Sequence, residues 1–365
     1  MGLFFSSKYV LPRFITRHML QDSWVEEYRA WEVNRRSFFS RAIPRACPSC
    51  ETTNSEYLWM SEDGYDYVKC RHCEMVYVTP CFTYDHWRDY NHIFQKESDD
   101  LNEKLISSRV DENYLAEDYS RFSYYINLLR KYRSHGRILD IGCLTGSFLK
   151  IAQEAGYSAS GVEFRHLAVE HIKKSLNLDV HEGYFEEISL KMIAEKQRFE
   201  IITLWETLEH MLYPKRVIED VSQLLVPGGH IAITVPNYDN LQVKILRERC
   251  FHCLGGPGNA GHINMFTRFT LRQMLEQFGF EVLLSETEGS SSYYDILSYF
   301  SDRFERIYSY KNAVKMPSIR ENVVHPEFLP PVLTNALLLF SPLYKIMENA
   351  LKKGSIIVMI AKKKT

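Results

Sequence analysis

The hydrophobic pattern of the chain becomes regular from about residue 136 onward. Short apolar runs, each long enough for one strand, alternate there with longer segments whose apolar positions recur at helical spacing. The runs are RILDIG, SASGVEF, DVHEGY, EIITLWE, HIAITVP, FEVLLSE and SIIVMIA. Buried strands that alternate with helices are typical of a parallel sheet covered on both faces. The pattern therefore predicts an α/β protein with a doubly wound, mostly parallel, seven-stranded sheet.

The pattern also divides the chain into four parts. We expect an N-terminal helical arm at 1–46, a small cysteine module at 47–84, and connecting helices at 85–135. The predicted sheet then occupies 136–365, and a long insert at about 289–353 separates its last two strands. An organelle transit sequence is the alternative for the arm, because its first 21 residues carry basic but no acidic side chains.

Composition narrows the partners and the location. A chain of 365 residues with 45% hydrophobic residues can bury a large core, and a net charge of −2 gives no electrostatic reason to expect a nucleic-acid partner. The apolar segment VLTNALLLFSPL, at 332–343, is too short to span a bilayer. We expect a cytoplasmic protein. Together with the basic arm, however, this segment leaves a peripheral membrane contact or a lipid-linked substrate as an alternative.

Four of the eight cysteines have the spacing of a metal site. CPSC supplies Cys47 and Cys50, CRHC supplies Cys70 and Cys73, and residues 51–69 lie between the two pairs. Two C-x-x-C knuckles at this separation are typical of a zinc ribbon. Four thiolates fill the tetrahedral shell of Zn²⁺ and leave no position for a reactive water, so we expect a structural zinc ion. RNA contact by the ribbon is a weaker alternative, because few basic side chains accompany it.

The turn after the first predicted strand carries the cofactor signal. Its sequence, DIGCLTG, places Asp140 before the turn and glycines at positions 142 and 146. A dinucleotide fold needs the pattern G-x-G-x-x-G to approach a pyrophosphate, and an acid there would repel one. Asp140 instead suits a ligand with an ammonium group, and Glu163, at the end of the next strand, suits ribose hydroxyls. The two acids describe S-adenosylmethionine better than NAD.

Five blocks, in order, resemble the class I S-adenosylmethionine-dependent methyltransferases. The blocks are ILDIGCLTGSFL, GVEF, FEIITLWETLEHMLYP, LLVPGGHIAITVPN and GHINMFTRFTLRQMLEQFGFEV. The chain looks most like bacterial members with an N-terminal zinc-ribbon-like module that act on sugars or other small metabolites. The resemblance implies that Gly142, Cys143 and Gly146 line the methionine end of the cofactor. It also implies that Glu163 binds the ribose and that Phe164 and Trp205 flank the adenosine.

One residue of the loop departs from the family pattern. Leu144 stands where the family usually has glycine, so either a side chain projects from the loop or the backbone adopts a different φ. Because both flanking glycines remain, we expect cofactor binding to survive. A non-catalytic cofactor-binding or assembly protein, in which the zinc module docks a partner, is the alternative.

Two histidines are candidates for a catalytic base. Methyl transfer to a hydroxyl group needs proton removal, and imidazole can accept a proton near neutral pH. His210 follows the fourth strand in WETLEH, and His262 lies in GHINMFT after the fifth strand. A role in holding the loop is the alternative for His210. For the run CFHCLGGPGNAGH, which ends at His262, a flexible loop over the substrate is preferred to a metal site. The predicted function is O-methylation of a sugar, glycan precursor or small metabolite.

Overall fold

The computed structural model describes residues 42–60, 66–86, 112–246, 262–289, 344, 346–348 and 350–365. The predicted N-terminal arm up to residue 41 therefore lies outside the described residues. So do residues 87–111 of the predicted connecting helices, the loop at 247–261 and most of the predicted insert. The fold below concerns the described parts.

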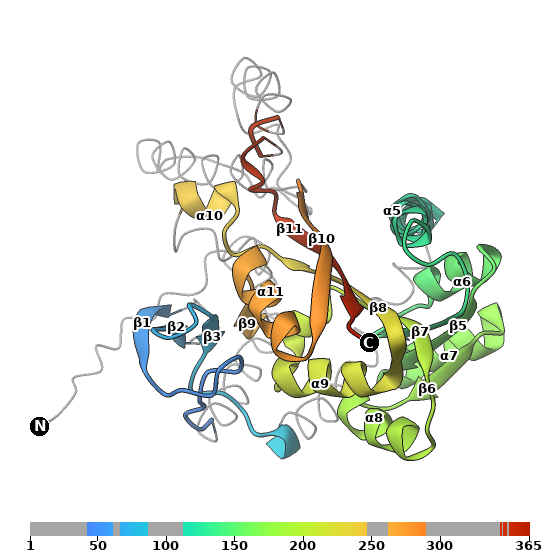
Figure 1. The fold of residues 1–365 in the computed structure, drawn as a ribbon, viewed down its shortest axis with the longest axis horizontal. Helices are drawn as coiled ribbons and strands as arrows, with labels where there is room; N and C mark the ends of the chain where they lie inside the picture. The colour runs from blue at the N-terminus through green and yellow to red at the C-terminus, as the bar shows by residue number, and fades with distance from the viewer. Residues whose placement is uncertain are drawn as a thin grey trace, which may run out of the picture.

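The main sheet has seven strands in the order β10-β11-β8-β7-β4-β5-β6 (Figure 1). They are β4 (Arg137–Ile141), β5 (Ser158–Glu163), β6 (Asp179–Glu182), β7 (Phe199–Trp205), β8 (Leu225–Pro236), β10 (Phe280–Glu288) and β11 (Ile356–Lys363). The five strands from β6 to β8 pair in parallel, whereas β11 pairs antiparallel with both β8 and β10. This order confirms the predicted mostly parallel, seven-stranded α/β sheet.

Helices cover both faces of this sheet. The α-helices are α5 (Glu112–Arg130), α6 (Ser147–Glu154), α7 (His166–His171), α8 (Phe185–Ala194), α9 (Pro214–Leu224), α10 (Leu241–Leu246) and α11 (Arg268–Gln277). A π-helical segment, η1 (Ile172–Leu176), and a short 3₁₀ turn, η2 (Leu208–His210), are also described. Side chains of α5 and α6 form one core with the sheet, and side chains of α8, α9 and α11 form a second core.

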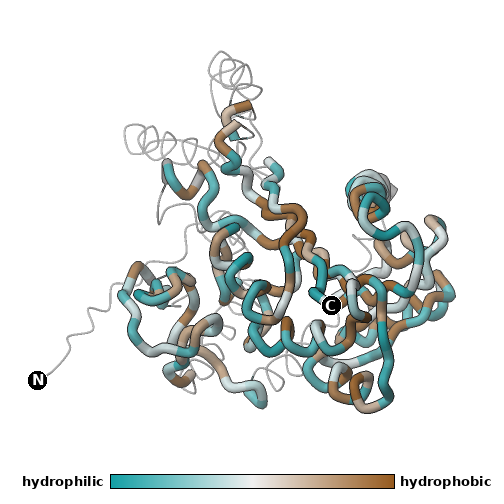
Figure 2. Tube along the Cα trace, viewed as in Figure 1, coloured by the Kyte–Doolittle hydropathy of each residue, from teal (hydrophilic) through white to brown (hydrophobic). Residues whose placement is uncertain are grey.

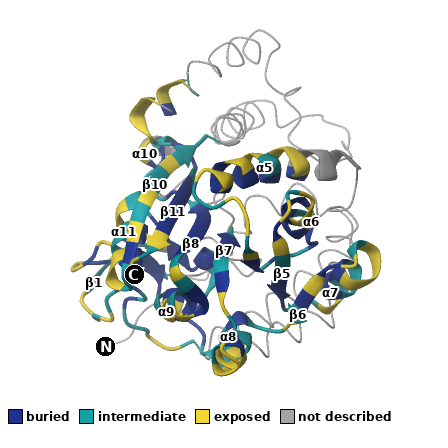
Figure 3. Ribbon diagram, turned by 45° about the vertical axis from the view of Figure 1, so that its right-hand side comes forward, coloured by how far each residue is buried: buried dark blue, intermediate teal, exposed yellow. Residues whose placement is uncertain are grey.

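Burial explains why the strands read as continuous apolar runs. In β7 only Glu200 and Trp205 are not fully buried, because helices lie on both sides of the strand. Figure 3 shows the same for the centre of the sheet, where β7, β8 and β11 are buried while the outer face of α5 is exposed. Figure 2 shows β11 as hydrophobic until its last residues, which are lysines. No described helix is long and apolar enough to cross a bilayer.

A second, smaller sheet contains the cysteine pairs. Its strands are β1 (Ser55–Met60), β2 (Asp66–Cys70), β3 (Val76–Val78) and β9 (Asn264–Met265), in the order β1-β2-β3-β9. β9 belongs to the segment between β8 and α11, yet it pairs antiparallel with β3. Val68 and Met75 of the small sheet also share one hydrophobic core with Phe266 and Leu271. The cysteine module therefore packs directly against the main α/β unit, and backbone hydrogen bonds between β3 and β9 join the two.

Candidate cofactor and acceptor site

A cavity of about 430 Å³ lies beyond the carboxyl ends of β4, β5 and β7. This is the edge at which a doubly wound sheet binds its ligands. The described lining includes six acids, namely Asp118, Asp140, Glu163, Glu186, Glu206 and Glu209, but only two arginines, Arg121 and Arg165. The excess of acids favours a ligand that carries positive charge.

The predicted glycine loop connects β4 to α6 and forms part of this lining. Gly142 has a φ of 76°, and a Cβ atom there would lie 2.7 Å from the Thr207 hydroxyl oxygen. Gly146 has a φ of 78°, but its added Cβ would meet Ile172 of η1, and Gly146 is not among the described lining residues. Gly142 therefore shapes the cavity, whereas Gly146 lets α6 begin close to η1.

Leu144 takes the conformation that glycine would take. Its φ is 44°, in the left-handed region that costs a residue with a Cβ roughly 1 kcal/mol. Of the two outcomes that the sequence left open, the backbone has kept the glycine-like shape. The backbone N–H of Leu144 then points to Glu163 and donates to its Oε2 atom at 3.0 Å.

Glu163 lies where the ribose-binding acid was expected. It ends β5, is only 2% exposed, and lines the cavity. Its Oε1 atom accepts hydrogen bonds from the backbone N–H of Arg165 at 2.9 Å and from the Arg165 guanidinium at 3.3 Å. A carboxylate has about four acceptor positions, so these contacts fix the side chain and leave capacity for ribose hydroxyls.

Asp140 is fully buried at the end of β4. The Thr203 hydroxyl donates to its Oδ1 atom at 2.6 Å. Burial raises the pKa of Asp140 to about 8, against the opposing effect of the Thr203 hydrogen bond and with a further rise from the Glu163 charge. A cation in the cavity would favour the charged carboxylate. The acids of the cavity therefore fit S-adenosylmethionine, whose ammonium and sulfonium groups are both positive.

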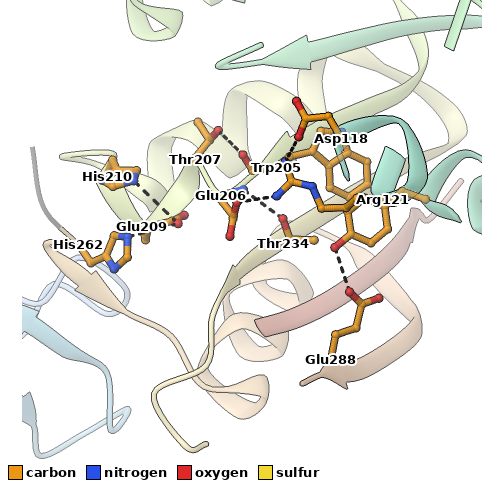
Figure 4. A network of polar contacts seen from close by, with 11 residues as sticks. Asp118, Arg121, Trp205, Glu206, Thr207, Glu209, His210, Thr234, His262 and Glu288 are labelled. Atoms are coloured by element: carbon orange, nitrogen blue, oxygen red, sulfur yellow. Dashed lines mark hydrogen bonds and ion pairs between the residues drawn. The ribbon is translucent and has the colours of Figure 1, made fainter. Parts of the chain in front are cut away.

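The two predicted aromatic residues line the same cavity but belong to different ring clusters. Trp205 stacks on Tyr125 of α5, with centroids 4.7 Å apart, and Phe148 packs against it edge-on. Phe164 stacks on Tyr184 with centroids 5.0 Å apart. Both aromatic faces thus have protein partners in this structure. The Arg121 guanidinium, from α5, reaches Glu206 next to Trp205 at 3.1 Å (Figure 4).

The two candidate catalytic histidines meet around a third residue that sequence reasoning missed. The Nε2 atoms of His210 and His262 each lie 3.9 Å from the Oε1 atom of Glu209, and the two imidazole centroids are 4.9 Å apart (Figure 4). All three residues line the cavity. The acid next to His210 in WETLEH was visible in the sequence, but nothing in the pattern indicated that its side chain would turn inward.

Glu209 is an unusual residue in this position. It is 1% exposed, and among the described residues neither carboxylate oxygen has a hydrogen-bond partner of ordinary geometry, although the residue's own backbone N–H lies close enough to act on the carboxylate. Burial raises its pKa well above the ordinary value for glutamate. The nearest ligand-type atoms of Glu209, His210 and His262 lie within 4.8 Å of one another, which is a separation that a metal ion could bridge.

The cysteine module holds this histidine cluster in place. The Arg45 guanidinium donates to the backbone carbonyls of Leu212 at 3.0 Å and Ile263 at 2.8 Å. The Tyr67 hydroxyl donates to the carbonyl of His262 at 3.0 Å. From β9, the side-chain amide of Asn264 donates to the carbonyl of Glu209 at 3.3 Å. Both histidine-bearing segments are therefore fixed against the small sheet.

The four predicted metal-binding cysteines converge. The sulfur atoms of Cys47 and Cys73 are 3.5 Å apart, as are those of Cys50 and Cys70, and all four lie within 4.8 Å of one another. The two knuckles have the same turn. In each, the residue after the second cysteine has a positive φ and donates its N–H to the carbonyl of the first. Four thiols in this arrangement fit a tetrahedral zinc ion.

The fold and the acid-lined cavity fit a nucleotide-cofactor-binding α/β domain, and comparison with known proteins shows what this domain is similar to. Residues 111–285 match a family model described as a methyltransferase domain. Residues 111–285 therefore carry a methyltransferase domain, which agrees with the resemblance of the sequence to the class I S-adenosylmethionine-dependent methyltransferases.

Two relatives and one solved structure illustrate the range of the similarity. The chain is 32% identical over 108 residues to a ubiquinone biosynthesis O-methyltransferase from Nitrosococcus oceani, covering 28% of this chain and 44% of the relative. A protein of the same name from Ralstonia nicotianae is 31% identical over 98 residues, covering 26% and 41%. The chain thus spans less than half the length of these relatives. A crystal structure of an S-adenosylmethionine-dependent methyltransferase from Archaeoglobus fulgidus is 20% identical, with a TM-score of 0.42 over 69% of this chain and 100% of that one.

Proposed function

We propose that this protein transfers a methyl group from S-adenosylmethionine to a hydroxyl group of a small molecule, such as a sugar, a glycan precursor or another metabolite. One observation carries the proposal. The cavity at the carboxyl edge of the family-matched domain holds strand-end acids suited to the cofactor and, in the same space, a buried group of proton-accepting side chains. The O-methyltransferase names of the two relatives support the choice of an oxygen acceptor.

The cofactor would be held by residues of the first two parallel strands. Asp140 would balance its positive charge, Glu163 would accept from the ribose hydroxyls, and Gly142 would let the loop approach closely. When bound, S-adenosylmethionine supplies a methyl group on a sulfonium, which makes in-line positioning the main catalytic requirement. Trp205 and Phe164 would contact the cofactor in one of two ways. Their ring edges would touch it from the lining of the cavity, or their present stacking partners would shift and free a ring face.

The acceptor side would be formed by His262 and His210. A hydroxyl group loses its proton as the methyl group arrives, and either imidazole is placed to accept that proton through its Nε2 atom. The shared neighbour Glu209 would fix the orientation of both rings. Zinc bound by Cys47, Cys50, Cys70 and Cys73 would have a structural role, because it would hold the small sheet that braces both histidine segments.

Two measurements test the proposal together. Calorimetric titration should show binding of both S-adenosylmethionine and its demethylated product, and Glu163→Ala should weaken both by about 1.5–3 kcal/mol, the usual range for hydrogen bonds to a charged group. A metabolite extract incubated with labelled methyl donor should then yield a labelled ether that alkaline hydrolysis does not release. Cofactor binding without any labelled product would favour a non-catalytic protein. A Glu163→Ala variant that binds as tightly as wild type would sink the ribose assignment.

A further inference from the structure

We infer that Glu209, His210 and His262 form a second metal site, which binds one divalent transition-metal ion at the acceptor end of the cavity. The inference about binding stands on the geometry of these three side chains. The part of it that concerns the acceptor rests on the proposed function. The site is distinct from the four-cysteine site. Two of its ligands, Glu209 and His210, precede β8 in the sequence, and the third, His262, follows β8.

The spacing of the three side chains is the first argument. Both imidazole Nε2 atoms lie 3.9 Å from the same carboxylate oxygen, Oε1 of Glu209. That separation is too long for a hydrogen bond, whose heavy atoms lie within about 3.2 Å. Ligand atoms at about 2.0–2.2 Å from a metal ion lie roughly 3–3.6 Å apart, so a small inward movement would complete the coordination. Three ligand-type atoms that converge at this separation leave room for one ion between them.

The charge of Glu209 is the second argument. Placing a carboxylate in an apolar interior without a hydrogen bond costs several kcal/mol, and native proteins rarely leave such a group unmatched. Both oxygens of Glu209 are buried, and among the described residues the only donor that acts on them is the backbone N–H of Glu209 itself, which is too poorly placed for an ordinary hydrogen bond. A divalent ion would balance the carboxylate and satisfy an oxygen and two nitrogens at once.

The ligand set and the position then indicate the type of site. Two imidazoles and one carboxylate are ligands typical of catalytic Zn²⁺ and of other first-row divalent ions, and three protein ligands leave at least one coordination position open. Because all three residues line the cavity, the open position faces the space where the acceptor would bind. Arg45, Tyr67 and Asn264 fix the backbone on both sides of the site.

The ion would deprotonate the acceptor more effectively than a free imidazole. A hydroxyl oxygen bound at the open position has a lowered pKa, so its proton passes to solvent before or during transfer. The oxygen lone pair then forms the new O–CH₃ bond while the S–CH₃ bond breaks, and its electron pair stays on sulfur. No oxidant or further reactant is needed. His210 and His262 would act as ligands in this scheme, and the acceptor would be a hydroxyl that can reach the ion.

Cobalt distinguishes the two sites spectroscopically. Metal-free full-length protein, prepared in reductant and titrated with Co²⁺, should bind two equivalents. The four-thiolate site should give intense sulfur-to-metal charge-transfer bands in the near ultraviolet. A site with two nitrogen ligands and one oxygen ligand should give only weak d–d bands in the visible range. Glu209→Gln keeps the size of the side chain but removes its charge. It should abolish the second set of bands and weaken that site by more than the 10–100-fold typical for loss of an outer-sphere partner. His262→Ala should do the same.

A matched control tests whether any glutamate–histidine pair would behave in this way. Glu182 lies 2.9 Å from the imidazole of His166 in an exposed pair, and Glu182→Gln should leave two equivalents bound. Retention of the charge-transfer bands in Glu209→Gln shows that the variant is folded.

One equivalent of cobalt in the wild type, with only thiolate bands, would overturn the inference, and so would unchanged d–d bands in both Glu209→Gln and His262→Ala. Methyl transfer by protein with metal at the cysteine site alone would refute the role of the second ion toward the acceptor while leaving the proposed function intact. Two metals with no methyl transfer to any acceptor would do the reverse.

Discussion

Two groups of side chains that could hold a metal ion are linked through the β3–β9 pairing, and they differ in how they are assembled. The four cysteines come from two short knuckles of one small sheet and form a closed set of four identical ligands. Glu209 and His210 come from the turn after β7, whereas His262 precedes β9, so this group exists only after the main sheet has formed. The four cysteines, here called the closed group, leave no open coordination position and fit a structural ion. Glu209, His210 and His262, here called the open group, leave a position open and fit a catalytic role.

The same comparison shows what joins the two groups. The strand pairing of β3 with β9 and the side chains of Arg45 and Tyr67 connect the cysteine module to the segment that carries His262. Loss of order in the module should therefore reach the acceptor side of the cavity. The cofactor side depends on β4 and β5, which lie on the opposite side of β7 from β8 in the main sheet.

The largest expected effect comes from breaking the closed group. Cys47→Ser should remove the zinc ion, and structural zinc contributes on the order of 10 kcal/mol to its fold. We expect the purified wild type to contain about one tightly held zinc at this site, and the variant to lose that zinc together with most turnover. S-adenosylmethionine affinity should largely persist. Metal analysis by mass spectrometry and calorimetry measure the two quantities separately. If the freshly purified, reduced wild type holds no zinc, the ribbon interpretation fails.

The next effect comes from the open group. His262→Ala should lower turnover by about 10²-fold or more, because the proton of the acceptor loses its base or its metal ligand, while S-adenosylmethionine affinity stays nearly unchanged. His210→Ala is the comparison variant. If only His210→Ala abolishes turnover, His262 positions the loop and the turn after β7 carries the chemistry. If neither variant loses turnover, the acceptor atom needs no base, and an O-methyltransferase assignment should give way to an amine or carbanion acceptor.

A smaller effect concerns Asp140 on the cofactor side. Its pKa in the folded protein is about 8, above the ordinary 3.8, so between these values the native state holds a proton that the unfolded chain releases. Folding stability attributable to Asp140 therefore falls as the pH rises through this window.

A cationic cofactor favours the charged carboxylate of Asp140, so cofactor affinity should rise about tenfold from pH 7 to the plateau above pH 8. Calorimetry at pH 7 in buffers of different ionisation enthalpy should show close to one proton released on binding. Asp140→Asn should abolish that release, and a pH-independent affinity in the wild type would contradict the assignment.

The difference between the two groups also explains what the sequence could predict. The sheet was readable because β7, β8 and β11 are buried on both faces and so are continuously apolar. The cysteine group was readable because its ligands lie in local repeats, and Asp140 and Glu163 because strand ends meet at one edge of a parallel sheet. The inward turn of Glu209 depends on η2 and on the hydrogen bond from Asn264, which no local pattern encodes. The pairing of β9 with β3 was equally hidden, since β9 has only two residues.

The smallest expected effect tests whether the glycine loop is a locally defined feature like the cysteine knuckles. Leu144 holds a φ of 44°, and its N–H donates to Glu163. Leu144→Gly relieves roughly 1 kcal/mol of backbone strain in the folded state, but it also gives the unfolded chain more freedom, worth about 0.4–1 kcal/mol. The free energy of unfolding should therefore change by less than about 1 kcal/mol in denaturant titrations. Cofactor affinity should stay equal or become slightly tighter, since the Leu144 N–H remains in place. Leu144→Ala keeps the strain and removes most of the side chain, so it separates the two contributions. A complete loss of binding in both variants would show that the leucine side chain itself contacts the cofactor, and the loop would then depend on tertiary contacts, as the open group does.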